Sequence, residues 1–260
     1  QEVGGDILYK GPDGIRFLSA TEKVDDFALS RASEQIQAEI SSGFVSPEDA
    51  VSLVIRGKSQ YRIFYFSEAL PLNQEGFSCT RMLDQTASGT AWSLLRGFKV
   101  FCADSVSSGG EETILFSDGE SFVYQMEWGN SFDEKPIYCE FQTPFWVFED
   151  PSIRKTFYKH KAYIKLEGEF FLETQLLLNF NEEGQIQPSP KAFMKSLPTD
   201  STYGIGLYGS AIFTTLNKKE FMENLVGSGF SASILYKNND TNPQFTISSL
   251  DLQYTYNDRK

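Results

Sequence analysis

The chain is poor in the side chains that most enzyme and metal sites use. Its 260 residues include one histidine, His160, and three cysteines, Cys79, Cys102 and Cys139. An odd number of cysteines without CxxC spacing argues against a disulfide framework or a zinc site, and favours small buried side chains in a reducing compartment. A Ser-His-acid triad would need His160, which lies in a lysine-flanked segment where we expect a surface histidine. We therefore expect no enzymatic activity, no metal and no cofactor.

Long apolar runs and positive charge are scarce as well. No segment approaches the ~20 apolar residues that span a bilayer, so no membrane span is expected. The 23 Lys and Arg against 35 Asp and Glu give a net charge of -12, which argues against general affinity for nucleic acid. Residues 1–136 hold 11 Lys and Arg and 21 Asp and Glu, a net of -10, whereas residues 137–260 hold 12 and 14, a net of -2. This difference predicts a domain boundary near 136.

Aromatic residues are abundant, at 15% with 23 Phe and 12 Tyr, which favours β-structure. Three segments have the form strand, tight turn, strand: residues 5–19, 53–66 and 113–126. In the third we expect Asp118 to shape the turn and not to act as an acid or base. The segments start roughly 50 residues apart, close to the period of a four-stranded propeller blade. Unrelated hairpins in an antiparallel sandwich are the open alternative.

The predicted fold class is all-β, with one exception near the N-terminus. Residues 29–43 have the pattern of a short amphipathic helix, with Ser30 as cap, Ile36 and Ile40 four apart, and Gly43 as stop. We thus expect β-propeller blades over 1–136, with this helix between them. The chain begins at Gln1 without an initiator Met or a secretory signal, and we expect it to be part of a longer polypeptide.

From residue 137 onward the strands become longer. Residues 156–168 and 169–181 look like a long β pair, residues 182–201 like an irregular loop with three prolines, and further strands follow. This succession predicts an antiparallel β-sandwich over 137–260. Gly204, Gly206 and Gly209 have GxGxxG spacing, but β-type residues follow where a dinucleotide site needs a helix, so we expect a strand there.

A cluster of positive charge in residues 154–165 is the main candidate site. Under a period of two, Lys159, Lys161 and Lys165 share one strand face with Tyr163, and Arg154 and Lys155 precede them. Such a stripe could meet a phosphate backbone or an acidic neighbouring subunit. A solvated face kept soluble by lysines is the alternative.

The segment SDGESFVYQMEWGNSFDEKPI, followed by TPFWVFEDPSIRKTFYKHKAYIKLEG, resembles a known family. It is similar to the C-terminal part of the β-propeller nozzle (tail tubular protein B) and of related head-to-tail stoppers of short-tailed bacteriophages. The resemblance covers almost the whole chain through loose turn and apolar patterns. The matching positions, in order, are Phe132, Asp133, Pro136, Ile137, Pro144, Phe145, Asp150, Pro151, Arg154, Lys155, Gly227 to Ser231 and Tyr254. Glu134 departs from the pattern, which has glycine there, so the conformation of that turn is in doubt.

The resemblance implies a structural virion protein of the phage tail, assembled in the host cytoplasm. It implies a homo-oligomeric ring, commonly of six copies, that contacts adaptor and fibre proteins. Double-stranded DNA would be held back by the ring and then pass through its channel. A full propeller has more blades than this chain holds, so preceding residues are expected to be absent. Nozzle and stopper remain alternatives.

A receptor- or glycan-binding propeller module is the rival from another functional class. Trp92, Trp128 and Trp146 could supply stacking surfaces, although their positions in strands favour core packing. A glycan hydrolase with paired carboxylates is a third reading, because Asp and Glu are plentiful but no pair is placed.

Overall fold

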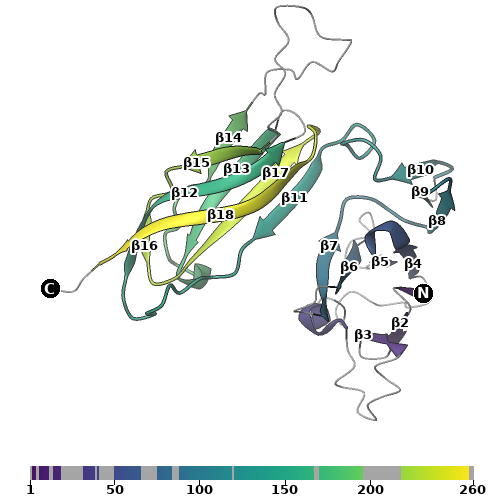
Figure 1. The fold of residues 1–260 in the computed structure, drawn as a ribbon, viewed down its shortest axis with the longest axis horizontal. Coiled ribbons are helices and arrows are strands. Elements are labelled where there is room, and N and C mark those ends of the chain that lie inside the picture. The colour runs from purple at the N-terminus through teal and green to yellow at the C-terminus, as the bar shows by residue number, and fades with distance from the viewer. Residues whose placement is uncertain are drawn as a thin grey trace, which may run out of the picture. The chain divides into compact units, whose positions relative to one another are not determined.

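The computed structural model describes residues 2–3, 6–11, 14–18, 32–38, 40, 50–65, 75–83, 88–118, 120–166, 170–195 and 218–257. These residues form several antiparallel sheets with very little helix, so the predicted all-β class is confirmed. The chain divides into two compact units, Gln1–Trp128 and Gly129–Lys260 (Figure 1). The charge difference along the sequence predicts this boundary a few residues later, near 136.

In its described residues, the first unit contains three antiparallel sheets that follow one another along the chain. In each sheet, strands that are adjacent in sequence are also adjacent in space, and the orders are β1-β2-β3, β4-β5-β6-β7 and β8-β9-β10. The strands are β1 (Glu2–Val3), β2 (Asp6–Gly11), β3 (Gly14–Phe17), β4 (Val51–Ile55), β5 (Gln60–Tyr65), β6 (Glu75–Leu83), β7 (Ser88–Leu95), β8 (Cys102–Ser108), β9 (Glu111–Ser117) and β10 (Val123–Met126).

The three predicted strand-turn-strand segments are confirmed as the hairpins β2–β3, β4–β5 and β9–β10. In the last of these, Ser117 pairs with Val123 across the turn. The backbone N–H of Glu120 donates to Oδ1 of Asp118 at 2.7 Å. Such a bond from a residue two positions on is an Asx-turn, which stabilises the turn from its own side chain.

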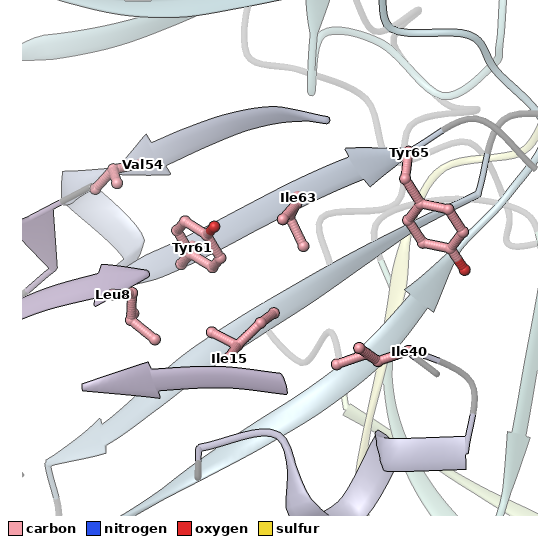
Figure 2. Packing of buried hydrophobic residues seen from close by; sticks show 7 residues of the cluster. All are labelled: Leu8, Ile15, Ile40, Val54, Tyr61, Ile63 and Tyr65. Carbon is pink, nitrogen blue, oxygen red and sulfur yellow. The ribbon is translucent and has the colours of Figure 1, made fainter. Parts of the chain in front are cut away.

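Strands β4 and β5 of the middle sheet are buried on both faces. On one face Val54, Tyr61 and Ile63 pack against Leu8 and Ile15 of the β1–β3 sheet, as Figure 2 shows. On the other face residues of β4 and β5 pack with Val100, β9 and β10 in a second cluster, which includes Leu53, Ile55, Phe64, Val100, Ile114 and Met126. The three sheets therefore stack face to face in chain order.

Polar bonds join the middle sheet to the third one. Ser105 on β8 donates its hydroxyl to the carbonyl of Val54 on β4, at 2.9 Å. The Glu112 carboxylate accepts the backbone N–H groups of Arg56 and Gly57 at 2.9 and 2.8 Å. Loss of hydration acts to raise the pKa of Glu112, but these two donors, the Ser105 hydroxyl and the charge of Arg56 together lower it.

Part of the helix expected over 29–43 is present. Glu34–Ile36 form a 3-10 turn, residues 37, 38 and 40 are helical, and Ile40 is buried in the first core cluster. Ser33 accepts the backbone N–H of Ile15 through its hydroxyl at 3.0 Å, which ties this turn to β3. Ser30 and Gly43 lie outside the described residues.

The described residues of the second unit form two four-stranded sheets around a shared core. One sheet has the order β11-β17-β13-β14, and in the other β12 pairs with β15, β16 and β18. Side chains of both sheets meet in one cluster, among them Ala162, Ile164, Leu172 and Ile234. The strands are β11 (Ile137–Gln142), β12 (Lys155–Leu166), β13 (Phe170–Leu178), β14 (Lys191–Lys195), β15 (Lys218–Glu223), β16 (Gly227–Gly229), β17 (Ala232–Asp240) and β18 (Phe245–Tyr256).

Two expectations about this unit are wrong. The strands at 156–168 and 169–181 exist as β12 and β13, but they belong to different sheets and do not pair. Each strand buries one apolar face, and the crossing lets these faces meet in one core. The loop expected over 182–201 contains β14, which pairs with β13. Gly204, Gly206 and Gly209 lie outside the described residues, so the strand predicted there stays a prediction.

Candidate functional site

Strand β12 carries the predicted lysine stripe. His160, Ala162 and Ile164 are 0%, 0% and 1% exposed and point into the core. Lys159, Lys161, Tyr163 and Lys165 alternate with them and therefore lie on the opposite face, where Lys159 and Lys165 are exposed and Lys161 is half-buried. The structure thus brings three of the five predicted site residues together on one surface.

Lys155 is not part of this surface. A register shift lies between Phe157 and Lys159 in the pairing of β12 with β18. Such a bulge reverses the alternation, so that Lys155 and Phe157 share the inner face and are both fully buried. The Nζ of Lys155 donates to the carbonyl oxygens of Val147 at 2.7 Å, Phe230 at 3.4 Å and Asp150. This lysine holds the segment between β11 and β12 against the sheet.

Arg154 has a third environment. Its side chain is exposed, and Nη2 donates to the carbonyl of Ser228 on β16 at 3.1 Å. Its own carbonyl accepts the backbone N–H of Asn257 at 2.8 Å, just after β18 ends. Arg154 therefore joins the start of β12 to the strands on both sides and lies apart from the lysine stripe.

His160 is buried, so the expectation of a surface histidine is wrong. Its Nε2 forms a hydrogen bond with the hydroxyl of Tyr236 on β17 at 2.6 Å, across the core. Nδ1 is buried and has no hydrogen-bond partner. Burial lowers the pKa of His160 to about 4, against a smaller opposite effect of the Asp251 carboxylate. The imidazole is therefore neutral at pH 7.

The neighbours of the stripe are mixed in chemistry. Lys161 lies between Asp251 on β18 and Met222 on β15, Lys159 lies opposite Gln253, and Tyr163 opposite Ser249. Met222 and Tyr163 are exposed by 49% and 38%. We call this outer surface the lysine face, and it consists of Lys159, Lys161, Tyr163, Lys165, Met222, Ser249, Asp251 and Gln253.

The cysteines and tryptophans agree only in part with the burial that we expected for them. Cys102 and Cys139 are exposed free thiols, so the expectation that they are buried is wrong, and the Cys79 side chain is outside the described part. Trp92 and Trp146 pack against core clusters as expected. Trp128 does not, because 75% of its surface is exposed.

Within the described residues, no group of three or more His, Cys, Asp or Glu is placed to hold a metal ion. No helix in that part of the chain has the length and apolar character needed to cross a membrane. The second unit contains a half-open apolar groove of about 490 Å³, lined by β11, β17, the 241–244 turn and β18.

The burial of His160 can be predicted from the sequence, whereas the burial of Lys155 cannot. Once Lys159 and Lys161 are placed on the outer face, strict alternation puts His160 on the inner face. The alternation of side chains was therefore sufficient to predict a buried histidine. The position of Lys155 depends on a bulge at Tyr158, and no glycine or proline marks it in the sequence.

Comparison with known proteins gives no family assignment. No protein-family model matches the chain, and no curated protein matches it in sequence.

Proposed function

We propose that this chain is a structural protein of a phage tail, of the nozzle or head-to-tail stopper kind, which forms a ring around a channel for the genome. The observation that carries the proposal is the stack of three antiparallel meanders in the first unit. Strands β4 and β5 of its middle sheet are buried on one face by the sheet before them in the chain and on the other by the sheet after them. Sheets stacked in this way are what successive blades of a β-propeller require.

The contact between β4 and β8 adds a second argument. These are the first strands of two successive meanders, and the hydroxyl of Ser105 bonds to the carbonyl of Val54 between them. In a propeller the first strands of neighbouring blades lie next to one another around the axis. The second unit, with two sheets on a shared core, corresponds to the β-sandwich that follows the last blade in this proposal.

The charge of the chain suits a conduit. With a net charge of -12, a lumen rich in carboxylates repels DNA within a Debye length of ~8 Å at physiological salt. The duplex would then slide without adhering to the wall. The partners would be further copies in a ring, commonly six, together with adaptor and fibre proteins, and the chain would need no catalytic residue or cofactor.

The proposal is tested by locating the protein. Antibodies raised against the chain should decorate the tail of intact phage particles, and peptides of the chain should be found in purified virions in a fixed copy number per particle. Absence of the protein from washed virions would refute a structural role in the tail.

One observation favours the second candidate, a receptor- or glycan-binding module. Trp128 exposes most of its ring, and exposed indoles stack on sugars. A glycan array with purified protein tests this candidate. Binding that is lost in Trp128→Ala and retained in Trp92→Phe would support it over the conduit.

A further inference from the structure

The third sheet of the first unit has one covered face and one exposed face. Ile114, Phe116 and Met126 pack against the middle sheet. The residues that alternate with them lie on the other side, and three aliphatic ones among them are well exposed: Val106 at 53%, Leu115 at 40% and Val123 at 71%. We call this surface the valine face, and it consists of Cys102, Asp104, Val106, Ser108, Glu111, Thr113, Leu115, Ser117, Val123 and Gln125.

The charges of the valine face and the lysine face are opposite. The valine face holds two carboxylates, Asp104 and Glu111, and no Lys or Arg, so its formal charge is -2. On β12 and β18 the lysine face holds three lysines and Asp251, a net of +2. Neither Lys159 nor Lys165 forms an ion pair within the described part of the chain. Each face therefore carries charge that the other could neutralise.

The spacing of the charges also matches. Lys161 and Lys165 are four residues apart on one strand. On the valine face, Glu111 of β9 lies beside Ser108 of β8, and Ser108 is four residues from Asp104. The two carboxylates are therefore also four residues apart along the strand direction. At a rise of ~3.3 Å per residue, both separations are ~13 Å along the strands. Both faces also expose apolar side chains, which add buried area to a sheet-on-sheet contact.

We propose that the lysine face of one copy of this chain docks on the valine face of a second copy. Because each copy has one face of each kind, the contact is head-to-tail and repeats from copy to copy, which gives a ring if the rotation closes. The inference rests on the proposed ring and names the surfaces that would build it. Asp251 and Met222, on either side of Lys161, suit a protein surface better than a phosphate backbone.

A charge-reversal experiment tests the docking. One double variant is Lys161→Glu with Lys165→Glu, and the other is Asp104→Lys with Glu111→Lys. In each variant both faces have the same sign, so we expect self-association to weaken at least ~10-fold in dissociation constant, measured by sedimentation velocity. In an equimolar mixture of the two double variants, the lysine face of each variant meets the oppositely charged valine face of the other. Assembly should therefore return. Circular dichroism checks that both variants are folded.

Two further measurements complete the test. Lys135→Glu and Glu183→Lys change exposed charges away from both faces and should leave assembly unaltered. Zero-length cross-linking of a mixture of 14N and 15N protein should join Lys161 or Lys165 to Asp104 or Glu111 in hybrid-isotope pairs. Pairs within one isotope only would mean docking inside a single chain, and would overturn the proposal. Loss of duplex DNA binding in Lys161→Glu, Lys165→Glu with assembly intact would overturn it as well.

The outcomes separate this inference from the proposed function. If both reversed variants still form the same rings as the wild-type protein, the docking is refuted and the proposed conduit is not. Association that follows the charge reversal but gives open chains without a channel would refute the conduit and leave the docking standing. A wild-type protein that stays monomeric at 100-fold excess over its cellular concentration would refute both.

Discussion

At the residue scale, two buried ionisable side chains are the least expected features of the molecule. Lys155 and His160 lie on the same strand, within five positions of each other, and both are fully buried in the second unit. Buried polar groups need partners, because an unpaired one costs free energy that folding must offset. Lys155 has three carbonyl acceptors, whereas His160 has one partner and one unpartnered nitrogen.

Removing the Lys155 ammonium should destabilise the protein. In Lys155→Met the carbonyls of Val147 and Asp150 lose their donor inside the structure, and we expect the free energy of unfolding to fall by about 2–3 kcal/mol. Lys159→Met is the matched control on the same strand, because its side chain is exposed, and should stay within about 0.5 kcal/mol of wild type. Urea denaturation measures both. Equal effects of the two substitutions would show that Lys155 is not an anchor.

His160 should make stability depend on pH. Its pKa is lowered to about 4 in the folded chain, against about 6.5 in the unfolded chain. The unfolded chain therefore binds a proton that the folded one excludes, so this residue's contribution is complete above pH 6.5 and is lost as the pH falls towards 4. The expected loss is about 3 kcal/mol.

The comparison with His160→Gln isolates this effect, since His160 is the only histidine in the chain. The difference in unfolding free energy between wild type and the variant should shrink steadily between pH 6.5 and pH 4. A difference that does not change over this interval would mean that the folded protein protonates this imidazole as readily as the unfolded chain does.

At the element scale, the turns and hairpins were predictable, because their signals are local. Asp118-Gly119 between two alternating runs was enough to place β9 and β10. The pairing of β12 and β13 was not, since two strands joined by a short link can form a hairpin or cross between sheets. The choice depends on which apolar faces meet, and those faces belong to residues far apart in sequence, such as Ile164 and Ile234.

Glu112 connects two sheets, and its removal should weaken that connection. In Glu112→Ala the backbone N–H groups of Arg56 and Gly57 lose their acceptor, for an expected cost of about 1 kcal/mol, since the site is close to solvent. Glu183→Ala, which removes an exposed carboxylate away from the lysine face and the valine face, is the control and should change little. Hydrogen exchange of the Arg56 and Gly57 amides provides a direct readout. Unchanged exchange of both amides in Glu112→Ala would contradict this role.

At the scale of the whole molecule, the amino-acid composition was the best predictor of the fold class. The aromatic content and the lack of long helical patterns were sufficient for the all-β class. The positive stripe was predicted in part, since Lys159, Lys161 and Lys165 share a face and Arg154 and Lys155 do not join it. The proposed assembly of copies depends on surface residues, for which the sequence offers only the alternation of side chains and their charge.

The central claim is that copies of this chain form a ring around a channel. Electron microscopy of the purified, assembled protein tests it most directly. We predict closed particles with rotational symmetry and a central opening wide enough for a DNA duplex, ~20 Å. Single-copy particles, or chains of copies that never close, would contradict the account.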